Sequence, residues 1–139
     1  MRQSLAILTF DTPGAGPMEI TETVNGWLRA TDMRLGVVTL FSQHNSAGLL
    51  IAENAAADVK SAMAQWMALA VPDGEHFGDN PEDPDGMSAH IRTMLTGNSL
   101  TVPVADGRMM LGKWQALFLY EHSESARKRG VVAHFSGGG

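Results

Sequence analysis

The stretch from Asp73 to His90 is the densest group of chemically capable side chains in this chain of 139 residues. Its sequence, DGEHFGDNPEDPDGMSAH, holds six carboxylates and two histidines, and no Lys or Arg occurs between Lys60 and Arg92. Carboxylate oxygens and imidazole nitrogens are ligands for divalent cations. A long loop without apolar periodicity is uncommon unless it is functional or disordered. The stretch therefore favours either a metal site or a solvated acidic surface loop.

Two histidines lie where regular structure is expected to end or begin. His44 follows a β-branched and aromatic strand at 37–42, and His90 lies in the first turn of a helix, directly after the acidic stretch. A sheet fixes a residue at a strand end while the loop exposes it, so His44 is a candidate ligand, with an exposed loop histidine as the alternative. His90 borders an apolar stripe, where a core role is the alternative. We expect Asp85 and His90 to face one cavity.

Three further polar residues end apolar segments. Glu53 breaks the apolar strand at 49–51, although an acid there is also typical of a helix start. In the segment 114–122, a period of two places Gln115 and Glu121 on one face, at either end of apolar positions. Such residues often point into a site at the rim of a sheet, and fraying toward solvent is the alternative. Glu53, Gln115 and Glu121 are the candidate catalytic residues, the two glutamates as general acid or base.

The elements that position these residues are strands joined mostly in pairs by short links. A doubly wound parallel sheet would need a helix between successive strands, so we predict a single compact α+β domain with a largely antiparallel sheet. We place the domain at 1–136 and a flexible glycine tail at 137–139. The predicted elements are strands near 5–10, 37–42, 49–51, 100–104, 109–111, 114–121 and 131–135, and helices around the apolar stripes at 20–28, 59–70 and 87–95, the last closed by Gly97.

Composition excludes several classes of protein. The net charge of −5 and the lack of a basic stripe argue against nonspecific nucleic-acid binding. The absence of cysteine excludes a disulfide framework, a thiolate nucleophile and a zinc finger. No apolar run approaches the ~18 residues of a membrane span. Nucleotide-binding glycine loops and the zincin and α/β-hydrolase motifs are missing from the sequence. We therefore expect a cytoplasmic protein without nucleic-acid or membrane partners.

Three segments together resemble the YjbQ-like family, also labelled secondary thiamine-phosphate synthase. The segments are FSQHNSAGLLIAENAAADV at 41–59, DPDGMSAHIRTMLTGNSLTVPVADGR at 83–108 and LGKWQALFLYEH at 111–122. The strand-end histidine, the Glu-Asn pair, M-x-A-H-I, the hairpin G-x-S-L-T-V-P and L-G-x-W-Q form a highly specific combination.

The resemblance implies a compact α+β homotrimer with a polar pocket that can hold a divalent metal ion such as Zn, Mn or Mg. This chain departs from the family pattern at Asn45 and Ala52, and the acidic stretch lacks one family histidine, for which His76 is a possible substitute. Carried onto this sequence, the implied metal ligands are His44, His90 and Asp85, the catalytic residues Glu53, Glu121 and Gln115, and the binding residues Asn54 and Trp114, to which we add Arg108 for its charge.

The activity implied is the joining of a hydroxymethylpyrimidine diphosphate to a thiazole phosphate with release of diphosphate. Such a reaction needs a divalent cation over the diphosphate and a cationic group to help it leave. Arg108, or the turn at 127–129, would supply that charge. We expect an enzyme acting on a small phosphorylated metabolite, for which this reaction is a candidate side activity. The alternatives are a metal-dependent hydrolase and a noncatalytic trimer that binds a metal or small ligand.

Overall fold

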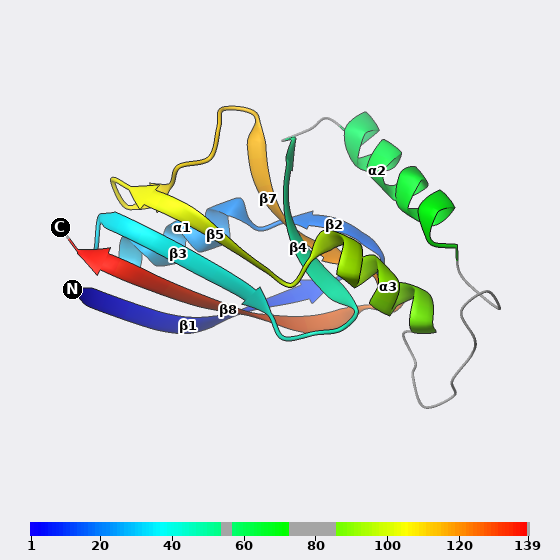
Figure 1. Ribbon diagram of the computed structural model, residues 1–139, viewed down its shortest axis with the longest axis horizontal. Helices are drawn as coiled ribbons and strands as arrows, with labels where there is room; N and C mark the ends of the chain where they lie inside the picture. Colours follow the sequence, from blue (N-terminus) through cyan, green and yellow to red (C-terminus); the bar gives the residue numbers. More distant parts are fainter. Residues whose placement is uncertain (54–56, 73–85, 139) are drawn as a thin grey trace.

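The computed structural model describes residues 1–53, 57–72 and 86–138, which form eight strands and three helices in two antiparallel sheets (Figure 1). The larger sheet has the order β1-β8-β3-β5-β6, and the smaller one the order β2-β7-β4. Their bounds are β1 Arg2–Thr12, β2 Gly16–Glu19, α1 Thr21–Ala30, β3 Leu35–Ser42, β4 Ala47–Glu53, α2 Ala57–Ala70, α3 Gly86–Thr96, β5 Ser99–Ala105, β6 Arg108–Met109, β7 Gln115–Glu121 and β8 Arg127–Gly138.

The core lies between the inner faces of the two sheets. Strand β8 pairs with both β1 and β3, and its residues alternate between buried and partly exposed positions, as a strand covered on one face should. On the opposing small sheet, Leu117 and Leu119 point into the core, while Phe118 and Tyr120 point away from it toward α2 and α3. The small sheet is therefore buried on both faces.

Helix α1 completes the core beside the small sheet. Val24 and Leu28 are fully buried and supply its apolar face. Asn25 lies on the same side of the helix, and its Oδ1 accepts the Met109 N–H at 2.9 Å. This hydrogen bond ties α1 to the β5–β6 hairpin, whose turn at Asp106 and Gly107 has φ values of 54° and 76°. The hairpin and its Asp-Gly turn were predicted and are confirmed.

Helix α3 is held against β4 by a close backbone approach. Gly97 has a φ of 89° and closes the helix, with its N–H donating to the Thr93 carbonyl at 2.7 Å. Its own carbonyl accepts the Leu49 N–H at 2.9 Å. A Cβ on Gly48 would lie 1.9 Å from Thr96 Oγ1, so only glycine permits this contact. The predicted helix end at Gly97 is confirmed.

The predicted class, a single α+β domain with antiparallel sheets and three helices, is confirmed. Strand β2 was not predicted, because its segment reads as a turn, although an edge strand tolerates Pro17. Gly137 and Gly138, which were expected in a flexible tail, instead pair within β8, and Gly139 lies outside the described residues. None of the helices in the described ranges is long and apolar enough to cross a membrane.

Candidate functional site

The candidate catalytic residues lie at opposite ends of the β4–β7 pair. Gln115 at the start of β7 pairs with Glu53 at the end of β4, whereas Glu121 pairs with Ala47 at the start of β4. Six steps along a strand span about 20 Å. Glu53 and Gln115 share one end of the small sheet, while His44 and Glu121 lie at the other. Of the two glutamates, Glu53 therefore lies at the opposite end of the small sheet from His44, because successive ends of antiparallel strands lie at opposite edges of the sheet.

Glu121 is fully buried and both of its carboxylate oxygens are occupied. Its Oε1 accepts hydrogen bonds from Thr12 Oγ1 at 2.6 Å and Arg129 Nε at 2.7 Å. Its Oε2 accepts the Ser123 N–H at 3.1 Å and pairs with the Arg129 guanidinium. Arg129 also donates to Ser46 Oγ at 2.8 Å. This network ties β1, β7, β8 and the turn before β4 together, and it leaves the carboxylate no access to a substrate.

The electrostatics of Glu121 agree with a structural role. Burial by itself raises the pKa of the Glu121 carboxyl, but hydrogen bonds from Arg129, Thr12 and the Ser123 N–H outweigh it and hold the pKa below its ordinary value. The Glu121 carboxyl is therefore ionised at pH 7 and pairs with the Arg129 guanidinium. A general acid or base must exchange a proton with the substrate. Glu121 is not placed to act as either, because no substrate can reach it.

His44 connects neighbouring segments through hydrogen bonds. Its Nε2 accepts the Gly130 N–H at 2.9 Å, and its carbonyl accepts Asn98 Nδ2 at 3.1 Å. The neutral ring therefore carries its hydrogen on Nδ1. A metal ion on Nε2 would have to displace the Gly130 N–H, so the lone pair best suited to coordination is already used. This geometry does not fit the expected ligand role.

His90 is half-buried and is not one of the residues that hold Glu121. It lines a cavity of about 230 Å³ with Asn45, Thr93, Met94 and Asn98. The predicted partner Asp85, the predicted binding residue Asn54 and His76 all lie outside the described residues. Within the described ranges, no cluster of three or more His, Cys, Asp or Glu side chains could hold a metal ion.

His122 is a buried histidine that sequence reasoning did not single out. It is 2% exposed, its ring stacks on Tyr120 with centroids 4.6 Å apart, and its Nε2 lies 3.2 Å from Thr96 Oγ1. Burial and, next, the positive charge of Arg92 lower the pKa of His122 to about 4. The ring is therefore neutral at pH 7, and it joins β7 to the last turn of α3.

The opposite end of the small sheet is open and polar. A cavity of about 300 Å³ lies where α1 begins, against β6 and the start of β7. Two of the predicted residues, Arg108 and Gln115, meet there, and Glu53 lies beside Gln115 because directly paired residues share a face. The cavity is lined by Glu19, Thr21, Glu22, Asn25, Arg108, Met109, Leu111, Gly112, Lys113 and Gln115.

The cations of this polar cavity share it with Glu19 and Glu22 but form no ion pair with them. In the ranges that the structure describes, neither Arg108 nor Lys113 forms an ion pair or a side-chain hydrogen bond. The Lys113 ammonium lies 5.1 Å from the centre of the Trp114 ring, a cation–π contact. Trp114 itself is 66% exposed and stands outside the lining of the cavity. Trp114 therefore reaches the site through Lys113.

Neutral donors complete the cavity. Asn25 is 3% exposed, its Oδ1 is used by Met109, and its Nδ2 has no hydrogen-bond partner within the described ranges. Gln115 is held by its Oε1, which accepts the Gly112 N–H at 2.7 Å, so its amide nitrogen stays available. No side chain caps the first turn of α1, whose N–H groups favour anions. The cavity thus offers an anion two cations and several N–H donors.

Sequence reasoning missed Asn25 and Lys113. Asn25 had a usable signal, because a polar residue beside Val24 on the apolar stripe of a helix implies a specific buried partner. Lys113 had none, since a lysine in a loop is ordinarily solvated.

Comparison with known proteins gives one consistent result. The model of the family described as "UPF0047 protein YjbQ-like" matches residues 6–138. UPF0047 protein sll1880 of Synechocystis is 37% identical over 98% of this chain and 93% of its own length. UPF0047 protein YjbQ of Escherichia coli O157:H7 is 33% identical over 76% of each chain.

Solved structures agree with the sequence relatives. The crystal structure of the conserved hypothetical protein TT1486 from Thermus thermophilus is similar with a TM-score of 0.84 and 30% identity, over 94% of this chain and 99% of that one. A YjbQ/UPF0047 protein of Clostridium acetobutylicum gives a TM-score of 0.83 at 25% identity, with 94% and 99% covered. The chain therefore belongs to the YjbQ-like UPF0047 family.

Proposed function

We propose that the protein binds a small phosphorylated metabolite in the polar cavity, with the phosphate between Arg108 and Lys113. The observation that carries this proposal is the pair of cations without ion-pair partners, which lie beside the available Asn25 Nδ2 and the uncapped start of α1. Phosphate oxygens accept charge-assisted hydrogen bonds from such groups. Arg129 cannot serve instead, because Glu121 and Ser46 already hold its guanidinium.

The two acids of the cavity restrict the rest of the ligand. Glu19 and Glu22 line the same space as the cations, so the ligand should combine a phosphate with a hydrogen-bond donor or a positive centre. An aminopyrimidine or a thiazolium ring meets this requirement. Among the reactions that the family resemblance implies, the joining of hydroxymethylpyrimidine diphosphate to thiazole phosphate therefore fits this cavity best.

In that reaction the residues of the cavity would act on the leaving group. The thiazole nitrogen lone pair forms a bond to the pyrimidine methylene carbon, and the C–O bond to diphosphate breaks with its electrons on oxygen. Arg108 and Lys113 would stabilise the departing diphosphate, and the Asn25 and Gln115 amides would orient it. No proton leaves in this step, so Glu53, which pairs with Gln115 at this rim, is our candidate to stabilise the positive charge that develops on the thiazole nitrogen.

Calorimetric titration with inorganic diphosphate tests the binding proposal. Arg108→Ala and Lys113→Ala should each weaken binding roughly tenfold, the usual loss for one charged hydrogen bond. Arg2→Ala and Lys128→Ala remove exposed cations of β1 and β8 and should leave the affinity unchanged. Equal losses in all four variants would mean diffuse charge attraction instead of a site. Product formation from the two heterocycles separates an enzyme from a noncatalytic binder.

A divalent metal ion is the second candidate ligand, with His90 as its proposed coordinating residue. His90 lines its own cavity and follows Asp85 by five positions, whereas His44 is engaged by Gly130. Zn²⁺ or Mn²⁺ should raise the melting temperature at pH 8, and His90→Ala should abolish that rise without changing the metal-free value. A hydrolase using this ion would cleave a phosphate ester only in the metal-loaded wild type. A wild type indifferent to all of the ions, Mg²⁺ included, excludes this candidate.

We also propose that the outer face of the large sheet is the contact surface between copies of this chain. The resemblance to the family implies a homotrimer. Across β1, β8, β3 and β5 the outward residues form three registered rows without a single charged side chain. The rows are Gln3–Ser136–Val37–Pro103, Leu5–His134–Thr39–Thr101 and Ile7–Val132–Phe41–Ser99.

Exposure makes this sheet face unusual for a surface. Leu5 and Ile7 are 67% and 61% exposed, and Val37 and Phe41 are 43% and 46% exposed. Contiguous apolar patches of this kind mark interaction sites. Light scattering should show a trimer for the wild type and a monomer for Ile7→Glu. Leu69→Glu, at an 83% exposed position of α2, is the matched control and should remain assembled. A monomeric wild type at micromolar concentration would overturn the proposal.

A further inference from the structure

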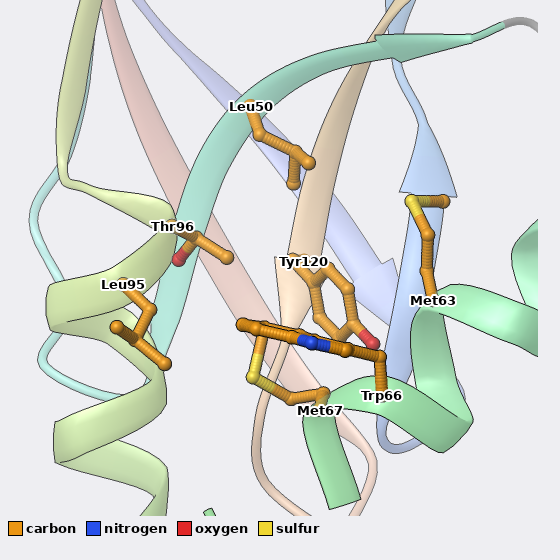
Figure 2. Close-up of a pocket in the computed structure, with 7 residues that line it drawn as sticks. All are labelled: Leu50, Met63, Trp66, Met67, Leu95, Thr96 and Tyr120. Carbon is orange, nitrogen blue, oxygen red and sulfur yellow. The ribbon is translucent and has the colours of Figure 1, made fainter. Parts of the chain in front are cut away.

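A second cavity lies on the other side of β7 from the polar one. It occupies the space between the small sheet and helices α2 and α3, with a volume of about 310 Å³ (Figure 2). That volume is at the lower end of the range for ligand pockets. Its lining residues are Leu50, Met63, Trp66, Met67, Leu95, Thr96 and Tyr120, none of them charged.

The lining is suited to a flat apolar guest. Figure 2 shows the Trp66 indole from α2 and the Tyr120 ring from β7 in the same space, with the Met63 and Met67 thioethers beside them. Methionine sulfur makes favourable contacts with aromatic rings and adapts to their shape. Met67 is the buried residue of α2, whereas Trp66 is 59% exposed. A large indole left half in solvent over an apolar cavity gains from a guest that covers it.

The hydroxyl of Tyr120 supplies a polar handle that nothing else in the described chain uses. Tyr120 is 4% exposed, and its hydroxyl forms no hydrogen bond with residues 1–53, 57–72 or 86–138. The oxygen itself is accessible from the cavity, because the only buried side-chain polar atom without a partner in those ranges is His122 Nδ1. Figure 2 shows the oxygen directed from β7 toward α2, beside the Trp66 ring. Stacking on His122, with centroids 4.6 Å apart, fixes the orientation of the phenol.

The other hydroxyl in the lining is already engaged. Thr96 Oγ1 lies 3.3 Å from the carbonyls of Arg92 and Thr93 and 3.2 Å from His122 Nε2. Burial raises the pKa of the Tyr120 phenol, although the Arg92 charge acts against this rise. The phenol is therefore neutral at pH 7 and can donate one hydrogen bond.

We propose that this cavity binds an uncharged planar aromatic molecule whose single polar substituent is held by the Tyr120 hydroxyl. The site is independent of the phosphate site, because Gln115 and Tyr120 point to opposite faces of β7. A phosphate or carboxylate has no counter-charge among the lining residues and would be excluded.

Methyl resonances of methionine labelled with ¹³C at the ε position give a direct test on the full chain. The probes are 2-naphthol, naphthalene and 2-naphthoate at pH 7. Titration with 2-naphthol should shift the Met63 and Met67 signals saturably, naphthalene should bind roughly fivefold more weakly for want of one hydrogen bond, and 2-naphthoate should not bind. The exposed Met94 and Met110 report on adsorption elsewhere.

Variants separate the handle from the apolar wall. Tyr120→Phe should lower the affinity for 2-naphthol to that for naphthalene and leave naphthalene binding unchanged. Trp66→Ala should weaken both, and Trp114→Ala, at an exposed tryptophan outside the cavity, should weaken neither. The proposal fails if Tyr120→Phe binds both probes as the wild type does, or if Met94 shifts alongside Met63. It also fails if Met63 and Met67 shift with protein concentration alone, because a second copy would then fill the cavity.

Discussion

The two ends of strand β7 carry similar polar residues in opposite environments. At its start Gln115 is exposed and opens onto a cavity with two cations. At its end Glu121 is fully buried and neutralised by Arg129. Both lie on the same face of the strand, so the alternation of side chains does not distinguish them. The difference is that Glu121 forms an ion pair with Arg129 from β8, whereas the two cations at the Gln115 end form no ion pair in the ranges that the structure describes.

This contrast separates binding from stability. Charges at the closed end are removed from water and held by hydrogen bonds, so their loss should be felt in folding. Charges at the open end stay solvated and unpaired, so their loss should be felt in ligand binding. Variants at the two ends should therefore change different measurements.

The largest effect is expected for Glu121→Gln. The substitution keeps the shape but leaves the Arg129 guanidinium buried without its counter-charge, which typically costs about 3–5 kcal/mol. Urea denaturation followed by circular dichroism should show this loss in the free energy of unfolding. Glu124→Gln, three positions along at an exposed site, should change it by less than about 0.5 kcal/mol. Normal stability combined with lost turnover would instead identify Glu121 as catalytic.

The closed end should also make stability depend on pH. His122 has a pKa of about 4 in the folded chain, against an ordinary value of 6.5. Between these values the unfolded chain takes up a proton that the folded chain refuses, so stability falls as the pH drops through this window. The full penalty is about 3 kcal/mol.

Comparison of the wild type with His122→Phe isolates this contribution. The variant should lose less stability than the wild type between pH 6.5 and pH 4, while acid effects on Glu121 are common to both. His134→Phe removes a histidine from the outer sheet face and should keep the wild-type slope. Equal slopes in the wild type and His122→Phe would contradict the environment derived for the buried ring.

Local patterns predicted the elements well because each depends on a few neighbouring residues. The Asp106-Gly107 turn and the Gly97 helix end need backbone conformations with positive φ, and the Asp-Gly pair and the glycine predict these conformations. The inner and outer faces of β7 followed from period two. Strand β2 was missed because its pairing with β7 is set by tertiary contact, against the turn preference of Gly16 and Pro17.

The candidate site was predicted less well because its geometry depends on distant partners. Gln115 and Arg108 do meet in one cavity. The closure of Glu121 depends on Arg129, and the engagement of His44 depends on Gly130, which no local pattern contains. Glu53 and Glu121 were assigned the same role, yet the antiparallel pairing of β4 with β7 places them at opposite ends of the small sheet.

A smaller structural effect is expected at the contact between α3 and the closed end. In Gly48→Ala the new methyl group would lie 1.9 Å from Thr96 Oγ1 and 2.7 Å from the Gly97 carbonyl. The helix must move off β4, and the loss should be about 1–3 kcal/mol, as for other overpacked sites. Thermal unfolding measures it. Gly138→Ala, where a Cβ meets nothing within 4 Å, is the control. An unchanged melting temperature would mean that α3 can move away from β4 without loss of stability.

The smallest effect on stability is expected at the open end. Glu53→Gln changes an exposed carboxylate beside Gln115, and such surface changes usually stay within about 0.5 kcal/mol. If Glu53 stabilises the positive charge that develops on the thiazole nitrogen in the proposed reaction, the turnover number should fall at least tenfold while the dissociation constant for diphosphate stays the same, since the variant removes no cation. Glu124→Gln again provides the control, now for turnover. A loss of folding stability in Glu53→Gln as large as that of Glu121→Gln would show that the two ends of β7 do not differ as their burial implies.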